Sequence, residues 1–122
     1  MKYLLDTNII IYHLSGEKIA TEFILENFNK SVISQITFVE TLSFEYNEDE
    51  SRAVRDFLDC FTIIDTNKSI AIQCLKNRKL TKIKIPDNFI ASTAQVNDLI
   101  LVTRNTDDFK QLDLQLLNIF NF

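Results

Sequence analysis

The sequence predicts a three-layer α/β fold, in which helices cover both faces of a central parallel sheet of four to five short strands. Two observations carry this prediction. Short runs of apolar, often β-branched residues recur along the chain, and helical patterns separate them. Apolar strands about four residues long are typical of parallel sheets that are buried on both faces. Their alternation with helices indicates three layers.

Five segments are expected to form the strands. They are KYLL at 2–5, SVIS at 31–34, TIID at 62–65, LILVT at 99–103 and, more weakly, LLNIF at 116–120. The last of these is expected to close an edge of the sheet. Helical patterns are found at 18–28, 36–46, 51–60, 67–79 and 87–97. The helix at 87–97 follows Pro86, which is a favourable helix start.

Size and composition indicate a single domain over residues 1–122, long enough to bury a core. Apolar residues make up 46% of the chain and charged residues 25%, as in soluble globular proteins. No stretch approaches the roughly 20 apolar residues of a membrane span. The N-terminal segment also lacks the pattern of a signal peptide. A cytoplasmic protein without a membrane partner is therefore expected.

The charge of the chain is unevenly distributed. The net charge of −4 argues against a protein that simply coats nucleic acid. Residues 45–59 carry six acids, and we interpret this run as a solvated helix face. Residues 76–84, KNRKLTKIK, carry five cations and no anion, and this basic run almost adjoins Asp87. It could hold phosphate groups near that acid, or it could simply be a solvated surface.

The cysteines and the histidine are assigned structural roles. Cys60 and Cys74 lie in apolar surroundings and lack CxxC spacing, so we predict that both are reduced core residues. His13 has no histidine or cysteine partner with which to build a zinc site.

Acidic side chains fall where an open α/β fold places its chemistry, beyond the carboxyl ends of the strands. Asp6 follows the first strand, and Asp87 opens a helix. Glu40 falls between Ile36 and Phe44 on a predicted helix, so we expect it to point inward or toward a cleft edge. Each acid has an alternative interpretation, as a helix cap or as a side chain that reaches solvent.

Taken together, the acids favour a metal site. Asn105, Asp107 and Asp108 follow the strand at 99–103, so polar groups from three or four separate segments gather at strand ends. Carboxylates that converge without histidine or cysteine favour a hard cation, Mg²⁺ or Mn²⁺. Such a site suits hydrolysis of a phosphodiester bond by metal-activated water.

Four motifs in order resemble the PIN-domain family, and within it the VapC-like toxins of toxin–antitoxin modules. LLDTNIII resembles the opening strand with its first acid, Asp6, and ISQITFVETL is similar to the segment that carries the second acid, Glu40. KIPDNFIASTA resembles the helix of the third acid, Asp87, and LVTRNTDDF resembles the final motif. The match covers nearly the full length.

The resemblance implies a PIN-like fold and a metal-dependent endoribonuclease. Asp6, Glu40 and Asp87 would hold the metal, and Asn105 or Asp108 would complete the site. Asn105 stands where many members have an acid, which leaves a second metal open. The supporting residues would be Thr7, Asn8 and Thr103, and the candidates for binding substrate phosphate are Arg104, Lys82 and Lys84.

The resemblance also implies an RNA substrate, a homodimer and a VapB-like antitoxin. The antitoxin would bind along helices at 18–28 and 36–60, which offer Phe28, Phe44 and Tyr46. Two alternatives stay open at this point. One is a PIN fold that has lost catalysis and acts as a binding module. The other is a receiver-like phosphoacceptor domain, although the single Asp6 after the first strand and the Thr-Arg-Asn at the end of the late strand fit it poorly.

Overall fold

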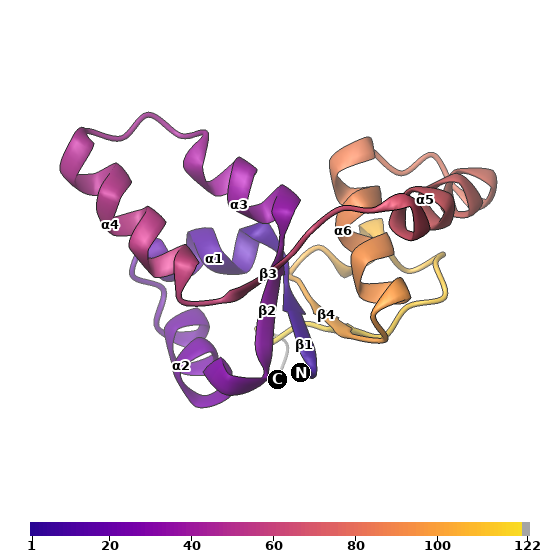
Figure 1. The fold of residues 1–122 in the computed structure, drawn as a ribbon. Coiled ribbons are helices and arrows are strands. Elements are labelled where there is room, and N and C mark those ends of the chain that lie inside the picture. Colours follow the sequence, from indigo (N-terminus) through magenta and orange to yellow (C-terminus); the bar gives the residue numbers. More distant parts are fainter. Residues whose placement is uncertain (121–122) are drawn as a thin grey trace.

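A computed structural model describes residues 1–120 and contains a five-stranded sheet flanked by helices (Figure 1). The strands are β1 (Tyr3–Leu5), β2 (Ser31–Ser34), β3 (Thr62–Ile64), β4 (Ile100–Val102) and β5 (Leu116–Leu117). All neighbouring strands are parallel, in the order β3-β2-β1-β4-β5. Each predicted strand is therefore present, and the weak last one does form an edge.

In the described part of the chain, six helices flank the sheet. They are α1 (Thr7–Leu14), α2 (Lys18–Asn27), α3 (Gln35–Leu42), α4 (Glu48–Asp59), α5 (Lys68–Leu80) and α6 (Ile85–Val96), and short 3₁₀ turns cover Phe28–Lys30 and Thr106–Asp108. In Figure 1 the helices α1 to α4 lie on one side of the strands, and α5 and α6 lie on the other. This is the predicted three-layer α/β/α arrangement.

Alternate residues of the short strands build two separate cores. Leu5, Ile33 and Val102 pack with apolar residues of α1, α2 and α4. Leu4 and Leu101, one residue earlier in β1 and β4, pack on the opposite face against α6. Because successive side chains of a strand point to opposite faces, three consecutive apolar residues are enough to hold helices on both sides.

Small residues let α6 lie close to the sheet. Ala91 and Ala94 are fully buried against the strand residues Leu4 and Leu101. The partner of α6 on its outer side is α5, and the two helices share a buried polar contact described below. The helix that carries Asp87 is thus held between the sheet and α5.

The helix α1 is not predicted by the local sequence. Ile9, Ile10 and Ile11 are consecutive and β-branched, which favours a strand in isolation. Ile9 and Ile10 are completely buried against the sheet, and the Asp6 carboxylate accepts a hydrogen bond from the first helical N–H group. Capping and burial therefore override the local preference.

Two further expectations need correction. The predicted helix at 36–46 ends at Leu42, because Ser43 caps it and Asn47 starts α4 with a capping box. Cys60 is exposed and does not belong to the core, whereas Cys74 is buried as predicted. Leu58 and Phe61 turn toward the core and leave the intervening Cys60 on the solvent side.

The acidic segment behaves as expected, because the acids of α4 are all exposed. His13 is half-buried, lies 2.8 Å from the Thr21 hydroxyl and stacks near Phe57, which agrees with a structural role. Within residues 1–120, no helix has the length and apolar character needed to cross a membrane.

The core of the α6 side can be tested with a pair of substitutions. Ile90→Ala removes a side chain that is completely buried, so the free energy of unfolding should fall by about 2–5 kcal/mol. Leu75→Ala on α5 is the control, because Leu75 is 66% exposed and its loss should change the value by less than about 0.5 kcal/mol. Urea denaturation measures both, and equal losses would contradict the described core.

Candidate active site

The first acid, Asp6, is buried at the carboxyl end of β1. The residue is only 5% exposed to solvent. Its backbone N–H donates a hydrogen bond to the Val102 carbonyl at 2.9 Å, which fixes Asp6 against β4. Asp6 is also the N-cap of α1 and accepts a hydrogen bond from the Thr7 N–H at 2.8 Å. The end of the strand and the start of the helix together fix this carboxylate.

Side chains after β4 complete the support of Asp6. The Thr103 hydroxyl donates to Asp6 Oδ2 at 2.7 Å. Thr103 Oγ1 in turn accepts from Asn8 Nδ2 at 3.2 Å and from the Asn105 N–H at 3.1 Å. Thr103 and Asn8 thus both contact the Asp6 carboxylate. This network orders the carboxylate without neutralising its charge.

Glu40 is attached to the same site through Thr7. The Thr7 hydroxyl donates to Glu40 Oε1 at 2.7 Å and lies 3.0 Å from the Thr37 hydroxyl. Glu40 does lie at a cleft edge, but the reason differs from the expected one. Val39 and Phe44 are more than half exposed, so apolar neighbours do not draw the carboxylate inward. The hydrogen bond from Thr7 holds it there.

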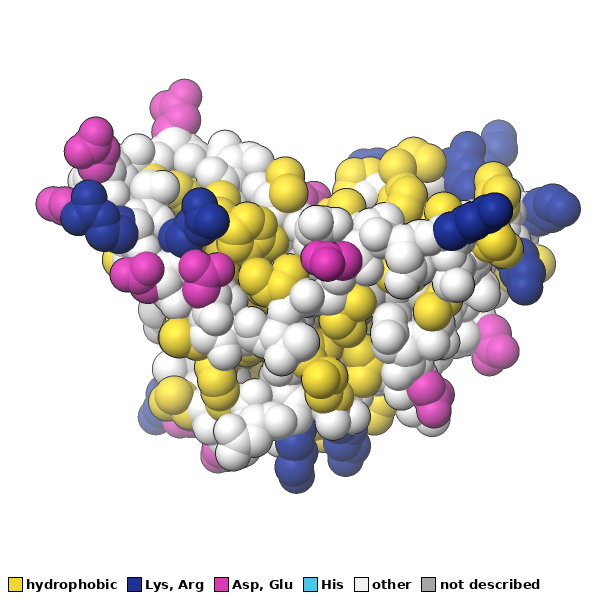
Figure 2. Space-filling model, viewed as in Figure 1, with side chains coloured by type: hydrophobic (Ala, Val, Ile, Leu, Met, Phe, Trp, Pro, Cys, Tyr) yellow, Lys and Arg dark blue, Asp and Glu magenta, His cyan; other side chains and the backbone are white. Residues whose placement is uncertain are grey.

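Two adjoining clefts meet at Asp87. The first, which we call the Asp6 cleft, has a volume of about 390 Å³ and lies among α1, α3 and α6. It is lined by Asp6, Thr7, Asn8, Ile11, Tyr12, Glu40, Asp87 and Asn105. The view in Figure 2 shows the surface hollowed between the part that contains α3 and the part that contains α6.

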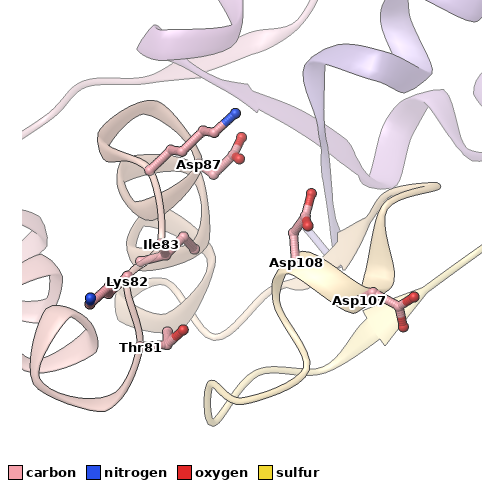
Figure 3. A pocket seen from close by; sticks show the side chains of 7 residues that line it. Thr81, Lys82, Ile83, Asp87, Asp107 and Asp108 are labelled. Carbon is pink, nitrogen blue, oxygen red and sulfur yellow. The ribbon is translucent and has the colours of Figure 1, made fainter.

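The second, the lysine cleft, has a volume of about 300 Å³. Its lining residues are Thr81, Lys82, Ile83, Lys84, Asp87, Asp107 and Asp108. Figure 3 shows the carboxylates of Asp87 and Asp108 on opposite sides of this space, whereas Asp107 points away from it. Asp107 instead forms an exposed ion pair with Lys110 at 3.8 Å.

The helix that presents Asp87 is fixed by polar side chains that the sequence patterns do not single out. Asn77 of α5 is buried and donates to Asn88 Oδ1, Ser92 Oγ and Gln95 Oε1 at 2.8–3.1 Å. Asn88 in turn donates to the Cys74 carbonyl at 3.0 Å. Because Asn88 adjoins Asp87, this contact sets the position of the first turn of α6.

The basic candidates lie around these acids in different ways. Lys82 and Lys84 line the lysine cleft, although Figure 3 shows the Lys82 side chain directed away from Asp87. The Arg78 guanidinium donates to the Ile83 carbonyl at 2.7 Å, which anchors the segment between these lysines. Arg104 is exposed, and its guanidinium lies over the rings of Tyr12 and Phe120.

Two acids of the site, Asp6 and Asp87, have a raised pKa, and burial is the largest cause for both. Burial raises the pKa of Asp6 from 3.8 to about 6, and the charges of Asp87 and Glu40 add to the rise against the hydrogen bonds from Thr103 and Thr7. Burial also raises the pKa of Asp87, with contributions from Asp108 and Glu40 and an opposing one from Lys84. A cation placed among these groups would relieve this repulsion.

The donor chemistry fits a hard divalent cation. Carboxylate and amide oxygens line the Asp6 cleft, and neither cleft is lined by histidine or cysteine. Within residues 1–120, however, no three acidic, histidine or cysteine side chains are grouped so that they could hold an ion together. Mg²⁺ commonly keeps several waters and uses only one or two protein carboxylates. The arrangement is therefore compatible with a hydrated ion.

Comparison with known proteins agrees with the motifs. The chain matches the PIN domain family over residues 3–114. Ribonuclease VapC2 of Haemophilus influenzae is 33% identical to it over 127 residues, which cover 92% of each protein.

Two solved structures have a similar fold. A toxin–antitoxin complex from Klebsiella pneumoniae contains a chain with a TM-score of 0.88 and 31% identity, over 99% of this chain and 100% of that one. VapBC-1 from nontypeable Haemophilus influenzae gives a TM-score of 0.83 and 29% identity, with the same coverage of both chains.

The chain belongs to the PIN domain family, and its resemblance to the VapC-like members is confirmed. The receiver-like alternative is set aside.

The buried charge of Asp6 should make stability depend on pH. Because Asp6 binds its proton more tightly in the folded chain, its ionisation lowers the free energy of unfolding as the pH rises from 3.8 to about 6. Asp6→Asn removes this effect. The free energy of unfolding of the variant minus that of wild type should therefore rise over this range, by on the order of 1–3 kcal/mol.

Urea denaturation with EDTA present, at several pH values, measures that difference. Asp113→Asn is the control, because it removes the charge of an exposed aspartate away from both clefts. A difference that stays flat with pH, as in the control, would contradict the described burial of Asp6.

Proposed function

We propose that this chain is a metal-dependent endoribonuclease, the toxin of a VapBC-type toxin–antitoxin pair. The observation that carries the proposal is the convergence of Asp6, Glu40 and Asp87 from three separate segments on one cleft. All three lie within residues 3–114, which match the PIN domain family, and the motifs around them resemble those of that family. A relative that matches over 92% of the chain is named as a ribonuclease.

In this proposal Asp6, Glu40 and Asp87 hold Mg²⁺ or Mn²⁺, directly or through water. When bound, the ion activates water for attack and neutralises charge on the phosphate. The raised pKa values of Asp6 and Asp87 support a cation here, since hydrogen bonds at Asp6 and Lys84 near Asp87 compensate for the two charges only in part. Asp108, across the lysine cleft from Asp87, is the candidate to complete the site.

The chain's other residues would orient these carboxylates. Thr103 and the Thr7 N–H hold Asp6 in one orientation, and the Thr7 hydroxyl holds Glu40. Asn8 donates to both Asp6 and Thr103, at 3.4 and 3.2 Å. Fixed side chains of this kind reduce the reorganisation that the reaction requires. Lys84, beside Asp87, and Lys82 would attract substrate phosphates.

The antitoxin would bind beside the C-terminal half of α1. Ile11, Leu14, Phe44 and Tyr46 line a largely apolar hollow there, and Phe44 is 55% exposed. Phe28, the other aromatic candidate, packs against Phe61 in the core cluster at 4.8 Å between ring centroids. The similar solved structures are toxin–antitoxin complexes, which supports a VapB-like partner. We also expect a homodimer.

A second candidate function is a PIN-fold binding module without catalysis. The observation that favours it is Asn105, an uncharged side chain in the Asp6 cleft where many members carry an acid. An amide oxygen can still ligate a metal, but it adds no charge.

Cleavage of RNA tests the proposal. Purified chain, free of antitoxin, should cut transfer or ribosomal RNA at discrete positions when Mg²⁺ or Mn²⁺ is present, and EDTA should stop the reaction. Asp6→Asn should reduce the rate by about 100-fold or more, because several kcal/mol of transition-state stabilisation depend on the metal. Mapping of the cut ends identifies the target.

Asp113→Asn is again the matched control and should cut at the wild-type rate. Cleavage by Asp6→Asn at that rate would contradict the proposed site. Absence of both cleavage and metal binding, measured by calorimetry on the wild-type chain, would favour the binding module.

A further inference from the structure

Arg104 is held against two aromatic rings from distant parts of the chain. Its guanidinium carbon lies 4.5 Å from the centre of the Phe120 ring and 5.2 Å from that of Tyr12. The two rings also contact each other edge to face, with centroids 5.2 Å apart. A planar guanidinium stacks favourably on aromatic faces. These three side chains, the Tyr12–Arg104–Phe120 cluster, form one packed unit.

The backbone around this cluster is tied to the site. The Arg104 N–H donates to Asn8 Oδ1 at 3.4 Å, and the next N–H, that of Asn105, donates to the Thr103 hydroxyl. Phe120 follows β5, and its N–H donates to Asn118 Oδ1 at 2.9 Å. Asn8 and Thr103 also hold Asp6. The cluster is therefore fixed relative to the first acid.

The charge of Arg104 is not used within the described structure. Among residues 1–120, no carboxylate forms an ion pair with Arg104, and its guanidinium N–H groups make no hydrogen bond. The two rings nevertheless order the side chain. Binding of a ligand therefore costs less conformational entropy than it would with a freely moving arginine. A guanidinium of this kind is suited to bidentate contact with a phosphate.

The Tyr12–Arg104–Phe120 cluster and the two lysines, Lys82 and Lys84, lie on opposite sides of the acids. Tyr12 lines the Asp6 cleft and not the lysine cleft, whereas Lys82 and Lys84 line only the lysine cleft. Asp87 belongs to both. Cations thus flank the acids on two sides, with the carboxylates between them. In the part of the molecule that contains α5 and α6, Figure 2 shows basic side chains gathered over α5.

We propose that a single RNA strand crosses the acids between these two groups of cations, and that Arg104 binds the phosphate next to the one at the carboxylates. This rests on the proposed function. Tyr12 and Phe120 are positioning residues, because they act by holding the guanidinium. Arg104 does not itself line the Asp6 cleft, which is why its contact is with a neighbouring phosphate.

Binding of a short, fluorescently labelled single-stranded RNA tests the path. Anisotropy is measured at several KCl concentrations in an Asp6→Asn background, so that the RNA stays intact. Arg104→Ala should weaken binding and reduce the slope of log K against log salt by about 0.7, the value for one phosphate contact to a single strand. In the active chain, the same substitution should raise KM more than it lowers kcat.

The aromatic support has its own variants. Phe120→Leu should weaken binding several-fold, and Phe120→Tyr should restore it because the ring is kept. Arg104→Lys should restore only part of the affinity, since a lysine ammonium keeps the charge but loses the planar stack and the bidentate contact. Thermal melting of each variant checks that the fold is retained.

Arg55→Ala is the matched control. Arg55 also lies over a ring, that of Phe38 at 5.4 Å, but it lines neither cleft, so its removal should leave affinity and salt slope unchanged. The strand path is overturned if Arg104→Ala behaves like Arg55→Ala while the wild-type chain cleaves RNA. If the wild-type chain neither binds nor cleaves RNA, the proposed function fails and the path fails with it.

Discussion

The site depends on one constraint, the burial of the Asp6 carboxylate at the end of a three-residue strand. A buried charge is costly unless other groups compensate for it. Here the compensation comes from hydrogen bonds donated by Thr7, Asn8 and Thr103, and it is incomplete, since the pKa of Asp6 rises to about 6. The fold thus keeps an acid under electrostatic strain at the point where Asp87 and Glu40 approach it.

The parallel sheet explains how acids distant in the sequence reach this point. β1 and β4 are neighbours, so Asp6 and Thr103 meet directly, and Ser34 at the end of β2 starts the helix that carries Glu40. Asp87 is positioned differently, because it lies on α6, and this helix is packed between the sheet and α5. The hydrogen bond from Asn77 to Asn88 fixes how α6 packs on α5, since a buried amide without its partners would be destabilising.

The sequence predicts the layers and the strands, because these follow from short-range patterns, and it proposes three acids for the site. Apolar runs indicate the strands, and Asp6 and Thr103 directly follow two of them, whereas Glu40 and Asp87 lie on helices. The helix α1 could not be predicted in this way, as its isoleucines favour a strand locally and become helical through capping by Asp6 and burial. The apolar neighbours of Cys60 predict a core residue, and only the face of α4 that packs on the sheet shows that it is exposed. The Tyr12–Arg104–Phe120 cluster joins residues more than a hundred positions apart, and no local pattern signals it.

The most direct test of the account is an anomalous difference map from crystals of the chain soaked in Mn²⁺. The account predicts a peak in the Asp6 cleft, within reach of Asp6 and Asp87 directly or through ordered water, and predicts its loss from crystals of Asp6→Asn. A map without a peak in that cleft at saturating Mn²⁺, or with a peak there that persists in Asp6→Asn, would contradict the claim that these carboxylates are assembled to hold a divalent cation.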